Sequence, residues 1–211
     1  MQFLYVMDPM CGWCYGFQPQ LDAFLEKSPN SQVTWVMGGL APDNDEPMDA
    51  ALRETIASYW HQIEGTAKVP FNHDYWRVNT PYRSTYPACR AVIAAESMDK
   101  GSSRTMVKAI QKAYYRDAKN LSLEGTLVTC ASVIGLGSEA FRRALRSDEI
   151  EQILREHLGI VRQLQVSGFP ALFYIGSETR AYPLTLGYCQ SAVLEQRLNS
   201  ILDDARKPGG V

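Results

Sequence analysis

The stretch DPMCGWCYGF, residues 8–17, decides the fold because it sets two cysteines three positions apart where the local pattern changes. It follows QFLYVM (2–7), a short apolar run rich in strand-forming residues. Apolar residues at helical spacing come next, and a Lys-Ser-Pro run at 27–29 ends them. We therefore expect Cys11 where a first strand gives way to a first helix, with Cys14 one helical turn further on.

The remaining sequence predicts a second strand, a long helical block and a return to strands. QVTWVMGG (32–39) is the second strand, so the first 40 residues predict strand, helix, strand, long enough for a crossover between parallel strands. Helical periodicity dominates from about residue 47 to 166. ALFYIG (171–176) and RAYPLTLG (180–187) are strand-like, and a last helix is predicted over 191–207. Pro183 places the fourth strand at an edge of the sheet because proline offers no N–H to a neighbour.

Composition describes an ordinary globular chain and excludes several functions. Of 211 residues, 45% are hydrophobic and 21% charged, with a formal net charge of −2. No basic cluster predicts a nucleic-acid partner, and no apolar run approaches a membrane span. The N-terminus has no basic stretch before its short apolar run, so a cytoplasmic location is expected. The five cysteines are an odd number, which favours a redox pair plus free thiols over a structural disulfide framework.

The position of the cysteine pair favours redox chemistry. A helix N-terminus presents free N–H groups and positive dipole, which lower the pKa of a thiol there below its free value of about 8.5. We expect Cys11 to be the exposed, attacking thiol and Cys14 the buried one that resolves a mixed disulfide. Trp13 would give a flat apolar surface beside the reactive sulfur.

A zinc site is the alternative to a redox pair, and the sequence does not favour it. Structural zinc needs four ligands, usually two such pairs or one pair with nearby histidines. His61, His73 and His157 are scattered without ligand spacing. We expect no metal and no cofactor. The other cysteines are expected to be small, buried, hydrophobic residues. They are Cys89, Cys130 and Cys189. Of these, Cys89 is the one whose segment is expected to face the active site.

A second motif, SGFPALFYIG (167–176), completes a resemblance to a known family. Together with DPMCGWCYGF and the helical block, it makes the chain resemble the DsbA-like branch of the thioredoxin superfamily, within the FrnE-like group. The resemblance implies an α/β, thioredoxin-like fold (βαβ…ββα) with a large all-helical insertion. Residues 1–45 and 165–211 would form the discontinuous thioredoxin-like domain, and residues 46–164 the helical insertion domain.

The resemblance also implies a function and roles for five residues. The chain would be a protein disulfide oxidoreductase or isomerase, with Cys11 as nucleophile and Cys14 as resolving thiol. Pro170 would follow a cis peptide bond and pack against the pair, while Phe169 would offer its backbone to substrate. Trp13 would also contact substrate. The implied partners are proteins or peptides that carry thiols or disulfides, with glutathione or thioredoxin as a redox partner.

One departure and two alternatives accompany this prediction. The periplasmic oxidase type has Pro-His between its cysteines, whereas Gly-Trp stands here, so a weaker oxidant is expected. A glutathione-dependent transferase or isomerase of the kappa-class type shares the insertion plan but typically has a serine at the nucleophile position. A non-enzymatic redox sensor, whose disulfide only changes partner affinity, is the third reading.

Overall fold

One mixed sheet lies at the centre of the molecule in the part described by the computed structural model, residues 1–176 and 180–206. Its strands run in the order β2-β1-β3-β4. Their bounds are β1 Gln2–Met7, β2 Gln32–Met37, β3 Ala171–Ile175 and β4 Ala181–Leu186. β1 and β2 are parallel, β3 is antiparallel to β1, and β4 is antiparallel to β3. Pro183 therefore lies on an edge strand, as predicted.

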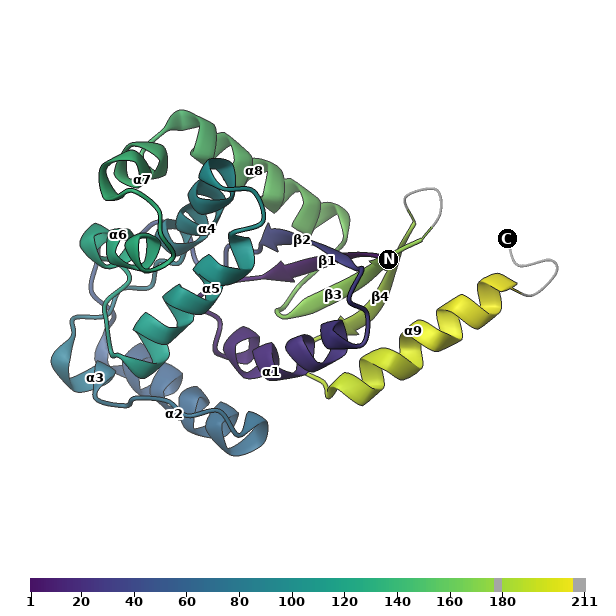
Figure 1. The fold of residues 1–211 in the computed structure, drawn as a ribbon. Helices are drawn as coiled ribbons and strands as arrows, with labels where there is room; N and C mark the ends of the chain where they lie inside the picture. Colours follow the sequence, from purple (N-terminus) through teal and green to yellow (C-terminus); the bar gives the residue numbers. More distant parts are fainter. Residues whose placement is uncertain (177–179, 207–211) are drawn as a thin grey trace.

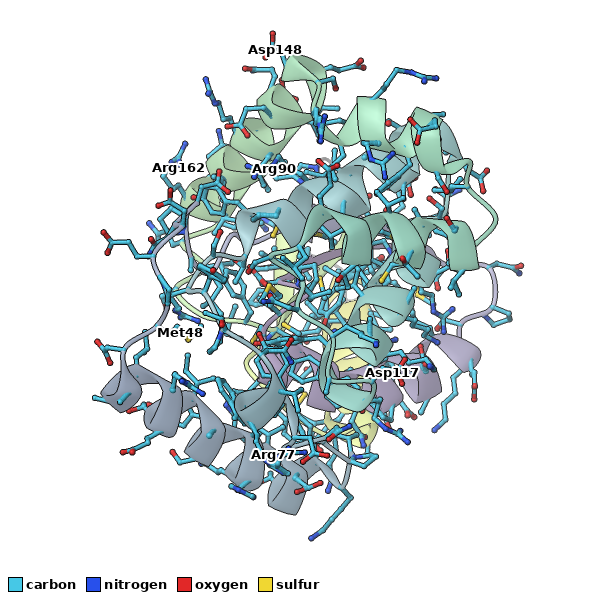
Figure 2. All side chains as sticks on the ribbon, turned by 90° about the vertical axis from the view of Figure 1, so that its left-hand side faces the viewer. Met48, Arg77, Arg90, Asp117, Asp148 and Arg162 are labelled. Atoms are coloured by element: carbon cyan, nitrogen blue, oxygen red, sulfur yellow. The ribbon has the colours of Figure 1, made fainter. Side chains whose placement is uncertain are left out.

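Nine α-helices and one π-helix surround this sheet in the described residues. They are α1 Gly12–Glu26, α2 Ala50–Ala67, α3 Tyr75–Val78, α4 Tyr86–Met98, α5 Ser103–Gln111, η1 Lys112–Arg116, α6 Glu124–Val133, α7 Ser138–Leu145, α8 Asp148–Gln163 and α9 Ser191–Arg206. The predicted end of the last helix, at residue 207, lies outside the described residues. Figure 2 looks onto the helical block between β2 and β3, whose helices lie in front of the sheet.

The alternation of side chains along β1 decides which helices cover each face of the sheet. Phe3, Tyr5 and Met7 are buried in the same apolar core as α1 and α9, which lie on one face. Val6 points the other way and is buried with Val161 of α8 on the opposite face (Figure 1). The sheet is thus apolar on both sides, as a covered α/β layer requires.

The helical block between β2 and β3 differs from the prediction at two points. The short helix α3 was not predicted. Within the helical periodicity predicted from about 47 to 166, residues 103–116 form α5 followed by the π-helix η1, which the sequence did not indicate. The wider turn of a π-helix fits the packing here, because the neighbours Tyr114 and Tyr115 are both buried, at 3% and 0% exposure.

The helical block packs directly against the helix that carries the cysteines. Ile63 of α2 lies so close to α1 that a Cβ on Gly12 would be 2.7 Å from its Cδ1. Trp60 of α2 contacts an aromatic cluster that includes Phe71 and Tyr115, each with its ring centroid about 5 Å away. One apolar core therefore runs from α1 into the block. The division into domains 1–45 with 165–211 and 46–164 stays a prediction.

The predicted fold class is confirmed. All four strands come from the two ends of the chain, in the order βαβ and ββα, and the described residues between β2 and β3 contribute only an isolated bridge between Pro47 and Tyr82. Among the described helices, none is both long and apolar enough to cross a membrane.

Replacing Leu21 by alanine tests the packing of α1 on the sheet. Leu21 is fully buried, so Leu21→Ala leaves a cavity and should lower the free energy of unfolding by about 2–5 kcal/mol in urea titrations. Leu123, 59% exposed, supplies the matched control, since Leu123→Ala should stay within about 0.5 kcal/mol of the parent. Equal effects of the two substitutions would contradict the described packing.

Candidate active site

Cys11 lies at the N-terminal end of α1, directly after the turn that follows β1. It is the residue before the first helical one, with φ −79° and ψ 117°. Its N–H donates to the carbonyl of Asp8 at 3.0 Å, and its carbonyl accepts from the N–H of Tyr15 at 3.1 Å. This is the predicted strand-to-helix position, where the free N–H groups of the first turn surround the side chain.

The pKa of the Cys11 thiol is lowered, and the causes can be named. A hydrogen bond from the Cys14 thiol contributes most, and the backbone N–H groups of Cys14 and Trp13 add to it. Burial and the nearby Asp8 carboxylate oppose the shift. The donors outweigh them, so the thiolate of Cys11 is favoured relative to a free cysteine.

Cys14 has the opposite character. It is fully buried, whereas Cys11 is 7% exposed. Burial is the main reason why the pKa of Cys14 is well above its ordinary value, and the neighbouring Cys11 raises it further. Both cysteines are free thiols in this structure. The expectation of an exposed Cys11 is therefore wrong, because Cys11 is itself buried. It is still the less buried of the two thiols and the one whose ionisation is favoured, whereas Cys14 stays protonated.

The segment 169–170 lies against the reactive sulfur. The Phe169–Pro170 peptide bond is cis, as predicted. The Sγ of Cys11 is 3.8 Å from the carbonyl oxygen of Phe169. The Phe169 ring occupies the space above Gly38, where a Cβ would be 2.3 Å from its ring carbons. Gly38, which the sequence marked only as a strand end, is therefore needed for this close approach.

Trp13 lies beside the pair but is only half-buried. Its indole packs against the ring of Tyr188, with 5.6 Å between the ring centroids. The remaining surface of the indole is open to solvent at the N-terminal end of α1. The structure thus brings together all five predicted residues: Cys11, Trp13, Cys14, Phe169 and Pro170.

A buried acid, Asp8, organises the approach to Cys11, and the sequence prediction missed it. Asp8 is fully buried. One carboxylate oxygen accepts from the N–H of Met10 at 2.8 Å. The other accepts from the N–H of Leu40 at 2.7 Å, from the Thr85 hydroxyl at 2.6 Å and from the Cys89 thiol at 3.5 Å. Burial raises the pKa of Asp8 although all four donors lower it.

The helical block also contacts the turn that carries Met10, between β1 and α1. The hydroxyl of Tyr115 in η1 donates to the carbonyl of Met10 at 2.7 Å. The ring of Tyr115 stacks on Tyr15 of α1, with 4.5 Å between centroids and 15° between planes. The helical block therefore contributes to the position of Cys11 and does not merely cover the sheet.

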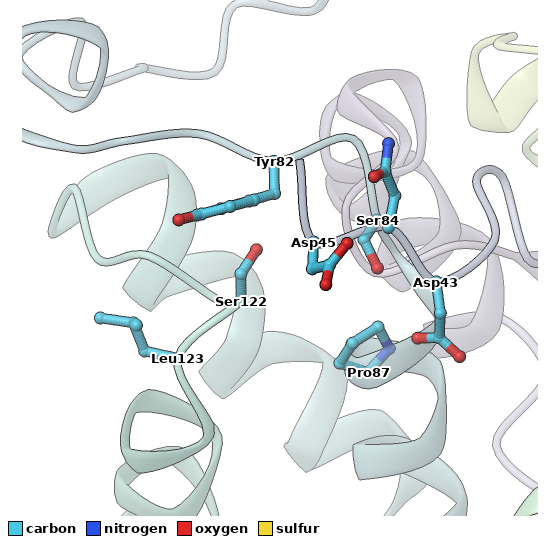
Figure 3. Close-up of a pocket in the computed structure, with 8 residues that line it drawn as sticks. Asp43, Asp45, Tyr82, Ser84, Pro87, Ser122 and Leu123 are labelled. Carbon is cyan, nitrogen blue, oxygen red and sulfur yellow. The ribbon is translucent and has the colours of Figure 1, made fainter. Parts of the chain in front are cut away.

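A hollow of about 560 Å³ opens next to this network. Figure 3 shows its lining, which comes from the loop after β2, the start of α4 and the segment before α6. Ser84 lines it and directly precedes Thr85, the residue that donates to Asp8. Its described lining residues include the carboxylates of Asp43 and Asp45. The lining residues are Asp43, Asn44, Asp45, Tyr82, Ser84, Pro87, Ser122 and Leu123.

The remaining cysteines and histidines follow the predictions only in part. Cys89 and Cys130 are buried, but Cys189 is half-buried. Cys89 does face the active-site turn, through Asp8, and burial raises its pKa well above the ordinary value. The reading of the histidines as scattered was wrong for two of them, because the rings of His61 and His73 stack at 3.9 Å.

Comparison with known proteins assigns the family. The model of the DSBA-like thioredoxin domain matches residues 4–198, nearly the whole chain. The chain therefore belongs to the DSBA-like thioredoxin family. The predicted DsbA-like relationship is thereby confirmed.

Solved structures agree with this assignment. A protein of Nitrosomonas europaea assigned as a protein disulfide isomerase has a TM-score of 0.85 and 29% identity, covering 96% of this chain and 97% of that one. The cytosolic disulfide reductase DsbM of Pseudomonas aeruginosa, crystallised with GSH, has a TM-score of 0.77 and 27% identity, covering 96% and 100%.

Curated relatives are more distant. The ClpXP adapter protein SpxH of Halalkalibacterium halodurans is 23% identical over 80% of this chain. SpxH of Bacillus subtilis is 22% identical over 96% of it. The chain spans 56% and 68% of the lengths of these two proteins.

Replacing Asp8 by asparagine should change how stability depends on pH. Because the native pKa of Asp8 is raised above its ordinary value of 3.8, the unfolded chain loses this proton before the native one does. Native stability therefore falls as the pH rises through that interval, and Asp8→Asn removes this loss. Urea unfolding from about pH 4 to about pH 8 should show the parent losing stability relative to the variant. A relative gain of the parent over that range would mean a lowered native pKa.

Alkylation should distinguish the thiols. With limiting iodoacetamide at neutral pH, Cys11 should react before Cys14, Cys89 and Cys130, because its pKa is lowered, whereas burial raises the pKa of Cys14 and Cys89 and raises that of Cys130 to about 11. Peptide mass mapping measures the order. First labelling of Cys14 or Cys89 would be inconsistent with the described site.

Proposed function

We propose that this protein exchanges disulfides with protein or peptide substrates through Cys11 and Cys14. The observation that carries the proposal is the contrast within the pair. Cys11, at a helix N-terminus, has a lowered pKa, and the fully buried Cys14 has a raised one. An enzyme that first forms and then resolves a mixed disulfide needs this division between its two thiols.

The reaction proceeds in two balanced steps. The Cys11 thiolate attacks one sulfur of a substrate disulfide, a Cys11–substrate disulfide forms, and the other substrate sulfur leaves as a thiolate. The Cys14 thiol then loses its proton and attacks the Cys11 sulfur. The Cys11–Cys14 disulfide forms and the second substrate thiolate leaves. Two electrons pass from the protein to the substrate, and the reverse sequence oxidises a substrate dithiol.

Substrate would lie across the 169–170 segment. The carbonyl of Phe169 faces the Cys11 sulfur, so an extended substrate can pair with this backbone while its sulfur meets Cys11. The exposed part of Trp13 offers an apolar contact on the other side of the helix N-terminus. Phe169, Pro170 and Trp13 thereby act as substrate-binding residues.

Glutathione or thioredoxin would restore the pair, in a cytoplasmic setting. The likeness to DsbM, a cytosolic reductase crystallised with GSH, supports glutathione as this partner. The Asp8 carboxylate near both thiols also favours a reducing rather than a strongly oxidising pair, because it disfavours the Cys11 thiolate and so the reduced form.

The SpxH relatives support a second candidate, a binding protein whose disulfide state changes its affinity for a partner. Those relatives are named adapter proteins. Catalytic turnover separates the two candidates, since an adapter without exchange activity reduces no more than one equivalent of a model disulfide. Conjugation of an electrophile to glutathione would instead indicate the kappa-class alternative.

Trapping a mixed disulfide tests the proposal. In Cys14→Ser the resolving thiol is absent, so incubation with a disulfide-containing peptide should leave the peptide bound to Cys11 and lower turnover by about 100-fold or more. Mass spectrometry of the acid-quenched protein measures the adduct. Cys89→Ser is the matched control, because it removes a buried thiol next to Asp8 but leaves both steps intact.

Three results would count against the proposal. One is full turnover by Cys11→Ser. Another is an adduct on Cys89 or Cys130 in the Cys14→Ser protein. Loss of turnover in Cys89→Ser as severe as in Cys14→Ser would likewise show that the pair is not sufficient.

A further inference from the structure

Three metal-ligating side chains meet on the outer side of α2, away from the thiol pair. His61 and Glu64 are one helical turn apart on α2, and His73 comes from the segment that leads into α3. One ligand atom from each of the three lies within 4.8 Å of the other two. The two imidazole rings stack with 3.9 Å between centroids and 8° between planes.

Glu64 and His73 already have the separation of two ligands on one metal ion. The Nε2 of His73 is 3.1 Å from Oε2 of Glu64. Two ligand atoms at about 2.0–2.1 Å from a tetrahedral zinc ion are about 3.3 Å apart. The other oxygen, Oε1, accepts from the N–H of Phe71 at 3.0 Å, which fixes the carboxylate with Oε2 towards His73.

The two histidines differ in how firmly their rings are held, since His73 is fixed by its surroundings and His61 is exposed. The Nδ1 of His73 is buried and has no hydrogen-bond partner, whereas its Nε2 is hydrogen-bonded to Oε2 of Glu64 and is the ring nitrogen on the side of the carboxylate. His61 is exposed, and among the described residues no hydrogen bond holds its ring. One of its ring nitrogens lies within 4.8 Å of the ligand atoms of Glu64 and His73, so only a small movement would be needed to reach a shared metal ion.

We propose that His61, Glu64 and His73 bind a divalent transition-metal ion, Zn²⁺ above all. Two imidazoles and one carboxylate are ligands that zinc accepts, and they leave a fourth position for water or another ligand. The thiol pair is not needed for this site. Its ligands are separated by two and eight residues in sequence, and packing of the 69–74 segment on α2 brings them together.

Binding would fasten the 69–74 segment to α2. Ile63 of the same helix contacts the active-site helix at Gly12, and Phe71 of the same segment packs on Tyr15 and Tyr115. The metal site and the thiol site thus share a helix and an aromatic cluster. The proposal concerns binding and does not depend on the proposed redox function.

Zinc titration of a protein without the Cys11–Cys14 thiol pair tests the site. The full-length Cys11→Ser/Cys14→Ser protein, checked by circular dichroism, is titrated with Zn²⁺ in a calorimeter. One equivalent should bind. His61→Ala and His73→Ala should each weaken this binding at least tenfold. Glu64→Gln should do the same while keeping an acceptor for the Phe71 N–H, and His61→Ala alters only an exposed side chain.

His157→Asn is the control for unspecific binding to histidine. His157 accepts from the N–H of Met37 at 3.1 Å, a role that an asparagine oxygen can keep, and this variant should bind Zn²⁺ as the parent does. The proposal is overturned if the parent shows no saturable binding. It is equally overturned if His61→Ala and His73→Ala bind like the parent, or if His157→Asn weakens binding as much as they do.

Discussion

The buried carboxylate of Asp8 is the constraint on which the position of Cys11 depends. Its two oxygens accept from the turn before α1, from the loop after β2 and from the start of α4. A buried carboxylate without hydrogen-bond donors would be strongly disfavoured. The three segments must therefore stay in place around Asp8 to supply these donors. The N–H of Cys11 then donates to the carbonyl of the same residue.

The same carboxylate limits the redox pair that it positions. Thiolate at Cys11 is stabilised by the Cys14 thiol and by backbone N–H groups, and is opposed by burial and by Asp8. No imidazolium lies between the cysteines to add positive charge, because Gly-Trp stands there. We propose that the reduced state of this pair is less stabilised than in the periplasmic DsbA type, so that cellular thiols can reduce its disulfide.

Much of the fold follows from local patterns in the sequence. The first strand was predicted over 2–7 and is found there, because a short β-forming run before Asp8-Pro9 leaves little choice. The cysteine pair and the Pro170 segment were also placed correctly, since strand-to-helix and loop-to-strand changes are visible in the neighbouring residues.

The features that the sequence did not predict depend on contacts between residues far apart in the sequence. Asp8 directly follows the predicted first strand, and only the packing of α4 brings Thr85, 77 residues later, to its carboxylate. His61 and His73 looked unrelated because no periodicity joins a helix to the loop that folds back on it. The π-helix η1 was not predicted for the same reason. It buries two adjacent tyrosines, and their burial is decided by the residues packed around them.

The reduction potential of the Cys11–Cys14 couple tests the central claim most directly. The protein is equilibrated in glutathione buffers of known ratio, quenched in acid, alkylated and weighed, so that the disulfide fraction gives the potential. A value clearly more negative than about −120 mV, the potential of DsbA, is expected, and each 30 mV corresponds to about 1.4 kcal/mol for two electrons. A value at or above that of DsbA would contradict the claim that Asp8 and the Gly-Trp dipeptide leave the reduced state only moderately stabilised.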